Sequence, residues 1–255
     1  PPPFQAEDGI RDKQICLVGS EMCIRDSQYI DRDIDAEMSR TTGRPIVTGS
    51  VTPARALAFG VGLGVISAAV LAAFANALTA ALALTGLLLY VGLYTLWLKR
   101  STPHNIVIGG AAGAVPPMVG WAAVTAEVGL PAITMFAIIF FWTPPHFWAL
   151  ALVLNRDYSA VDVPMLPVVA GEAETRVQVV LWSVVMAGVS LLPVAAGWAG
   201  GLYFAVAIAA GLGLVGLSLW ALAERGEIRR ARTVFLFSLL YLMVLFAALA
   251  VDAAL

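Results

Sequence analysis

Three aspartates lie within five residues in the segment Asp31-Arg-Asp-Ile-Asp35. If this segment is helical, Asp31 and Asp35 stand four positions apart and share one face, so their carboxylates can converge on one divalent cation. Carboxylate oxygens are hard ligands that suit Mg²⁺. Asp33 points away from that face, and we expect it to be a surface or supporting acid. The spacing therefore predicts a magnesium site, with a solvated helix end as the alternative interpretation.

Basic residues follow the aspartates and supply candidate contacts for an anion. Arg40 and Arg44 repeat the spacing of four, and both can hold an anionic group beside the metal. Lys99 and Arg100 lie at the end of an apolar stretch, where adjacent cations usually anchor a helix at the membrane surface. A phosphate contact is the second interpretation of Lys99 and Arg100. A metal with arginines at a membrane surface indicates a diphosphate ligand.

A second acidic group follows the fourth apolar stretch, in Asn155-Arg-Asp-Tyr-Ser-Ala-Val-Asp162. Asp157 is our candidate for a further metal contact. Asp162 is a plausible companion, although a spacing of five fits a loop better than one helical face. A polar loop without a metal is the alternative interpretation, and it is stronger for Asp162 than for Asp157.

The elements that must position these residues are membrane helices. The chain has 255 residues, of which 60% are hydrophobic and only 13% charged, too few to cover the surface of a soluble globule. Apolar segments of about 20 residues, the length that crosses a bilayer core, recur seven times from residue 54 onward. We therefore predict an all-α, polytopic membrane bundle of seven complete helices, with Asp31 and Asp35 at the end of an eighth. The seven spans are predicted at 54–75, 78–97, 105–126, 131–154, 176–197, 200–222 and 232–253.

Residues 1–27 differ from the rest of the chain because they are polar and contain both cysteines. Residues 17–27 are similar to an in-frame translation of a transposon adapter used to prepare sequencing libraries. We therefore expect residues 1–27 to be a non-native or disordered tail in front of a membrane domain over residues 28–255. A short natural tail outside the membrane is the alternative.

Charge predicts the topology of this domain. All twelve basic residues after position 27 fall in every second connection, and the other connections have none. By the positive-inside tendency, the charged side faces the cytoplasm and the C-terminus lies outside the inner, or cell, membrane. Asp31, Asp35, Lys99, Arg100 and Asp157 then share the cytoplasmic face. The twelve basic residues balance twelve acidic ones, and no nucleic-acid partner is expected.

Several motifs, in order, resemble the UbiA superfamily of intramembrane prenyltransferases, and within it the branch that farnesylates heme. They are Tyr-Ile-Asp31-Arg-Asp-Ile-Asp35 with Arg40-Thr and Arg44-Pro; Leu98-Lys-Arg with Thr102-Pro and Asn105-Ile; Gly109-Gly110 through Pro116-Pro117; Trp142-Thr-Pro-Pro-His146-Phe-Trp; and Asp157-Tyr with Val163-Pro-Met-Leu-Pro-Val-Val-Ala-Gly171. The superfamily has nine helices, so the resemblance implies that the first and most of the second precede this chain. The first motif also departs from the family pattern, because Ser27 stands where the family has asparagine.

The resemblance implies an enzyme that transfers the farnesyl group of farnesyl diphosphate to a vinyl group of heme B, giving heme O. Mg²⁺ as cofactor would be held by Asp31, Asp35 and Asp157. Further contacts to the diphosphate would come from Arg40, Arg44, Lys99 and Arg100. The substrate pocket would be formed in a dry, partly aromatic region of the bundle within the lipid bilayer by Asn105, Trp142, His146, Phe147, Trp148 and Tyr158.

His146 lies within an apolar span, where an ionisable side chain is costly and is a functional hypothesis by default. It can ligate or orient a porphyrin, or it can form a hydrogen bond between two helices. The sequence leaves both open.

Two other functions are consistent with the same residues. Another member of the superfamily would prenylate a quinone precursor or a chlorophyll-like acceptor. The segment Thr143-Pro-Pro-His146-Phe-Trp argues against this alternative, because it resembles the corresponding segment of the heme enzymes. An ion or small-solute carrier would place its acids at the bilayer midplane, whereas these acids are predicted at one face.

Overall fold

The computed structural model describes residues 30, 32–37, 41–98, 101–103, 105–160, 164–223 and 228–255. The regular elements in these ranges are all helical, and seven are long and apolar enough to cross a membrane. This confirms the predicted fold. The spanning helices are α4 (Pro53–Phe74), α5 (Ala77–Leu88) continued by the π-helix η1 (Leu89–Leu98), α7 (Asn105–Thr125), α8 (Leu130–Val153), α11 (Gly171–Val189) continued by α12 (Leu192–Ala195), α13 (Gly201–Leu222) and α14 (Arg229–Asp252).

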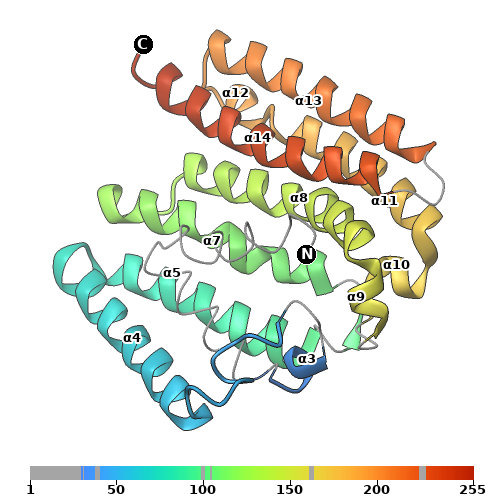
Figure 1. The fold of residues 1–255 in the computed structure, drawn as a ribbon. Coiled ribbons are helices and arrows are strands. Elements are labelled where there is room, and N and C mark those ends of the chain that lie inside the picture. The colour runs from blue at the N-terminus through green and yellow to red at the C-terminus, as the bar shows by residue number, and fades with distance from the viewer. Residues whose placement is uncertain are drawn as a thin grey trace.

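Three short helices complete the described fold: α3 (Arg32–Glu37), α9 (Asn155–Ala160) and α10 (Leu166–Val169). The spanning helices run back and forth beside one another, so their connections alternate between the two ends of the bundle (Figure 1). All three short helices lie at the same end, the one at which η1 ends and α7 begins (Figure 1). The bundle therefore gathers the sequence motifs at one end, whatever their separation along the chain.

The described chain before α4, residues 41–52, is a loop. Residues 41–50 form consecutive turns, and α4 begins at Pro53 after Thr52 in an extended conformation. Proline suits the first turn of a helix because the amide hydrogen it lacks would have no partner within the helix. Thr52 is the N-cap residue of α4, and its side chain makes no capping hydrogen bond.

The fifth span begins at Gly171, five residues before the predicted start. Its first turn contains Glu172 and Glu174, which lower the local hydropathy although the backbone is already helical. Gly171 has a positive φ of 85°, a conformation that favours glycine, and it makes the turn from α10 into α11.

The core lies around α8, which packs against α7, α11 and α14. Large buried side chains from α8, α11, α13 and α14 form one cluster that includes Trp148, Met186, Tyr203, Leu214 and Tyr241. By contrast, α4 packs on α5 and exposes many apolar side chains, as expected for a surface in contact with lipid.

Glycines on α7 permit the close approach of its neighbours. A Cβ at Gly110 would lie 2.9 Å from Cβ of Thr143 on α8, and Gly109 faces the ring of Tyr94 on η1. These two glycines pack closely against neighbouring helices, whereas a Cβ at Gly113 would meet no atom within 4 Å. The helix continues through Pro116 and Pro117.

Candidate active site

The two acidic motifs lie at the same end of the bundle, on α3 and α9 (Figure 1). Asp35 belongs to α3, while Asp31 and the side chain of Asp35 lie outside the part that the structure describes. Asp157 lies in the first turn of α9, partly buried. This helix follows α8 almost directly. The amides of Asp157 and Tyr158 donate to the carbonyl oxygen of Leu154, the C-cap residue of α8, at 3.1 and 3.2 Å.

Of the predicted anion contacts, Arg44 is described and lies in the turns before α4. Its amide donates to the carbonyl oxygen of Thr41 at 3.0 Å, and its own carbonyl accepts from the amide of Thr48 at 2.9 Å. The loop backbone around Arg44 is therefore folded into regular turns. Arg40, Lys99, Arg100 and Asp162 lie outside the described residues.

Asn105 and Tyr158 belong to segments that meet at this end. Asn105 is fully buried at the start of α7, and Ile106 beside it packs with Met165 in a small cluster. Tyr158 of α9 joins that cluster together with Tyr94 and Val168. The start of α7, η1 in the second span, and the segment of α9 and α10 after α8 are therefore held together by apolar contacts.

His146 and Trp142 lie one turn apart on α8 and both contact Ser238 on α14. The indole Nε1 of Trp142 donates to the carbonyl oxygen of Ser238 at 2.7 Å, and Nδ1 of His146 lies 2.7 Å from its hydroxyl oxygen. The Ser238 hydroxyl donates its one hydrogen to the carbonyl of Phe235 at 2.6 Å, which assigns the donor of the shared bond as Nδ1–H of His146.

The imidazole of His146 is also enclosed by rings. It stacks on Trp142 with centroids 4.1 Å apart and lies 4.7 Å from the ring of Phe235. Of the two roles considered for His146, the hydrogen bond between helices is the one that the structure shows.

The remaining aromatic candidates are not gathered on one wall. Phe147 is 37% exposed, whereas Trp148 is 2% exposed and packs edge-on against Trp182 in the core. Consecutive residues on a helix point about 100° apart, so these two side chains face different surroundings. Trp142 and His146 share Ser238 as a partner, and Phe147 packs edge-on against His146 with ring centroids 5.4 Å apart, whereas Trp148 packs in the core instead.

The donor set suits a hard divalent cation, since the candidate ligands are carboxylates. Within the described ranges, no group of three or more histidine, cysteine or acidic side chains is close enough to hold a metal. Those ranges contain Asp157 and do not contain Asp31.

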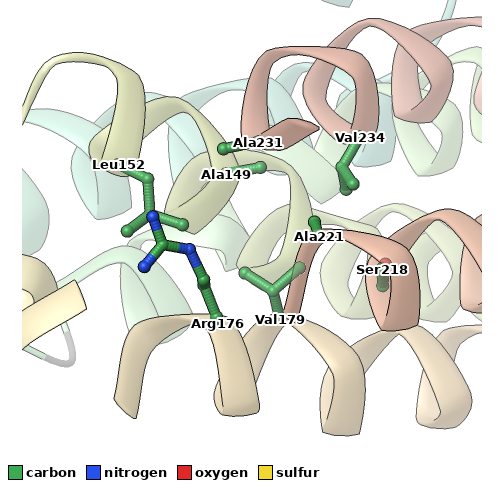
Figure 2. Close-up of a pocket in the computed structure, with 8 residues that line it drawn as sticks. All are labelled: Ala149, Leu152, Arg176, Val179, Ser218, Ala221, Ala231 and Val234. Atoms are coloured by element: carbon green, nitrogen blue, oxygen red, sulfur yellow. The ribbon is translucent and has the colours of Figure 1, made fainter. Parts of the chain in front are cut away.

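The sequence interpretation missed a polar group behind the second acidic motif. Arg176 on α11 is buried and paired with Glu172 at 3.1 Å, beside a small pocket between α8, α11, α13 and α14 (Figure 2). In the sequence, Arg176 counts only as one of the twelve basic residues that predict the topology. A glutamate four residues before an arginine is a known helical pairing and would have indicated this contact.

A model of the UbiA prenyltransferase family matches residues 15–250. The chain belongs to this family. The resemblance stated from the motifs is thereby confirmed, and with its apolar helices the chain is a multi-pass membrane protein.

Two curated relatives carry the same name. The chain is 55% identical over 228 residues to a protein of Thermus thermophilus named protoheme IX farnesyltransferase, a match that covers 89% of this chain and 37% of that protein. It is 50% identical over 224 residues to a protein of Gloeobacter violaceus with the same name, covering 88% of this chain and 73% of the relative. The chain spans 37% to 42% of the length of the first five relatives.

Solved structures support the fold. A UbiA homolog from Aeropyrum pernix matches with a TM-score of 0.71 at 19% identity, covering 98% of this chain and 91% of that one. A UbiA homolog from Archaeoglobus fulgidus, bound to GPP and Mg²⁺, matches with a TM-score of 0.67 at 17% identity, covering 91% and 84%.

Proposed function

We propose that the chain is the membrane domain of an enzyme that transfers the farnesyl group of farnesyl diphosphate to a vinyl group of heme B, giving heme O and diphosphate. The new carbon–carbon bond replaces the bond to diphosphate and leaves a cation on the second vinyl carbon, which takes hydroxide from one water molecule with release of a proton. The observation that carries this proposal is the identity of about half of the residues, over 88% to 89% of the chain, with proteins named protoheme IX farnesyltransferase. The placement of α3 and α9 at one end of the bundle agrees with it (Figure 1).

Asp31, Asp35 and Asp157 are the proposed ligands of Mg²⁺. Support comes from their oxygen chemistry and from the Archaeoglobus homolog, which was solved with a prenyl diphosphate and Mg²⁺. When bound, the ion would neutralise charge on the leaving diphosphate. The carboxylates fix the metal, and Arg40, Arg44, Lys99 and Arg100 would hold and orient the phosphate oxygens.

The apolar bundle would protect the reacting carbon. Once the bond to diphosphate breaks, the farnesyl carbon is electron-poor and would be captured by water. An interior built from apolar helices excludes water, and the faces of aromatic rings stabilise positive charge. Trp142 is the aromatic candidate with a half-buried position beside His146. We retain Asn105, His146, Phe147, Trp148 and Tyr158 as candidates for lining the pocket.

The reaction would occur at the cytoplasmic face of the cell membrane. The arginines at the start of α14 lie at the same end as α9 (Figure 1), and positive charge is enriched on the cytoplasmic side. The C-terminus, at the opposite end of α14, would then be outside.

The test is an assay of heme O formation in membranes that contain the chain with a natural N-terminus in place of residues 1–27. We expect product from heme B, farnesyl diphosphate and Mg²⁺, and its loss on chelation of the metal. Asp31→Asn, Asp35→Asn and Asp157→Asn should each lower the rate on the order of 100-fold or more, as removal of electrostatic stabilisation does. Asp33→Asn is the matched control within the first motif and should keep most activity.

Full activity in Asp31→Asn or Asp157→Asn would contradict the metal assignment. Turnover with an aromatic acid but not with heme B would favour an enzyme that prenylates a quinone precursor. Metal-dependent solute flux without any product would favour a carrier.

A further inference from the structure

Three polar side chains form a chain of hydrogen bonds behind Asp157. Asn155 donates from Nδ2 to Oε1 of Glu172 at 3.4 Å, and Arg176 donates from Nη2 to Oε2 of Glu172 at 3.1 Å. We call these three residues the Asn155–Glu172–Arg176 relay. Because Glu172 uses both carboxylate oxygens, it connects the short helix α9 to the spanning helix α11.

Arg176 is the fixed end of the relay. It is 6% exposed, and its side chain extends from α11 towards α8, where Leu152 lies (Figure 2). The small pocket beside it is otherwise lined almost entirely by apolar side chains of four helices: Ala149, Leu152, Val179, Ser218, Ala221, Ala231 and Val234. A cation buried among such residues is costly unless it is paired, so this packing and the ion pair fix where its guanidinium lies.

Glu172 would be mobile without this partner, since its side chain is 40% exposed at the start of α11. The bond to Arg176 spans four residues of one helix and orders the carboxylate. The ordered carboxylate then presents its second oxygen to Asn155.

Asn155 is the first residue of α9, and Asp157 follows two positions later. A helix of six residues is too short to be stable on its own, so its position depends on contacts with its surroundings. Tyr158 supplies one such contact through the cluster around Met165, and the hydrogen bond from Asn155 to Glu172 supplies another. The relay therefore restrains the backbone that carries Asp157.

We infer that the Asn155–Glu172–Arg176 relay is a positioning device that holds the carboxylate of Asp157 in place for the magnesium–diphosphate site. This inference rests on the proposed function. The groups that orient a metal ligand affect metal affinity although they do not touch the metal. Asn155, Glu172 and Arg176 are thus positioning residues, and Asp157 is the ligand they serve.

Glu174 provides a matched control on the same turn of α11. It is exposed and accepts a hydrogen bond from Gln178 at 2.8 Å, four residues along the same helix. This hydrogen bond therefore stays within α11 and does not connect it to another helix. Glu174→Gln removes the same charge as Glu172→Gln and leaves the relay intact.

The experiment measures binding of farnesyl diphosphate to the purified protein as a function of Mg²⁺ concentration, together with the rate of heme O formation. We expect Asn155→Ala and Glu172→Gln to raise the Mg²⁺ concentration for half-maximal binding on the order of 10-fold. Saturating Mg²⁺ should restore most of the maximal rate, because the catalytic groups are unchanged. Glu174→Gln should match the wild type in both measurements.

Asn155→Ala keeps the Glu172–Arg176 pair, so it tests the relay even if Glu172→Gln fails to fold. An unchanged Mg²⁺ dependence in Asn155→Ala would overturn the inference, as would a lower maximal rate without a shift in Mg²⁺ dependence. If the wild type binds farnesyl diphosphate with Mg²⁺ but makes no heme O, the proposed reaction fails while the binding data still decide the relay. If the wild type does not bind farnesyl diphosphate, both proposals are wrong.

Discussion

At the scale of single residues, the best-defined polar contact in the membrane interior joins His146 to Ser238. The imidazole donates to a hydroxyl that is itself used as a donor, and Trp142 bonds the carbonyl of the same serine. Hydrogen bonds between membrane helices contribute less than their isolation from water suggests, about 0.6 kcal/mol on average and up to about 1.7. Stacking on Trp142 adds further contact area to the same junction of α8 and α14.

We predict that a double-mutant cycle of His146→Ala and Ser238→Ala will show a coupling free energy of about 0.5 to 1.5 kcal/mol for unfolding in detergent. Ser238→Ala alone should destabilise the protein, since it leaves Nδ1–H of His146 without its acceptor. Thr85→Ala is the control. Its exposed hydroxyl bonds only the carbonyl of Ala81 on its own helix, so we expect a small effect and no coupling with His146→Ala. Additive effects of the two core substitutions would show that the bond contributes nothing measurable.

Residue-level features differ in how far the sequence can predict them. The aspartate spacing and the isolated histidine are visible because charges are rare in this chain. Ser238 gives no such signal, since a serine on an apolar helix is common and its partner lies 92 residues away. Whether His146 forms a hydrogen bond to another helix depends on which helix faces it, and the sequence does not specify that neighbour.

At the scale of helices, hydropathy predicts the number of membrane-spanning helices and their approximate lengths well. The seven predicted spans correspond to the seven observed ones because a stretch of about 20 apolar residues has few alternatives to crossing the bilayer. The start of α11 was wrong by five residues, since Glu172 and Glu174 extend the helix into the polar interface where hydropathy no longer reports it. The π-helix at Leu89–Leu98 had no signature in composition. Within it, the side-chain hydroxyl of Thr95 donates to the carbonyl oxygen of Tyr90 at 3.0 Å.

The contact between α7 and α8 gives a prediction at this scale. Gly110→Ala should destabilise the protein by about 1 to 3 kcal/mol, because the added Cβ would lie 2.9 Å from Cβ of Thr143 and force the helices apart. Gly113→Ala on the same helix meets no atom within 4 Å, so we expect it to be neutral or to stabilise by up to about 1 kcal/mol. Thermal unfolding in detergent would measure both. Equal effects of the two substitutions would contradict the close packing at Gly110.

At the scale of the whole molecule, the alternation of seven helices places distant motifs together. α3 and α9 are separated by more than a hundred residues yet lie at one end of the bundle (Figure 1). The sequence predicts this because every second connection lies at the same end of the bundle, and all basic residues after position 27 fall in those connections. It does not predict how far apart the acids are, since that distance depends on how α3, α9 and α10 fold back onto the helix ends.

The orientation of the bundle in the membrane is the last prediction. With Cys16 and Cys23 replaced by serine, single cysteines at Val128 and Ala160 would report the two ends, because both positions are exposed and lie in or beside connections at opposite ends. We expect a membrane-impermeant maleimide to label Val128→Cys on cells with an intact inner membrane, and to label Ala160→Cys only after that membrane is opened. The reason is that basic residues cluster at the end that contains Ala160, and a cluster of arginines is retained on the cytoplasmic side. Labelling of Ala160→Cys from outside would reverse the orientation and move the proposed diphosphate site away from the cytoplasm.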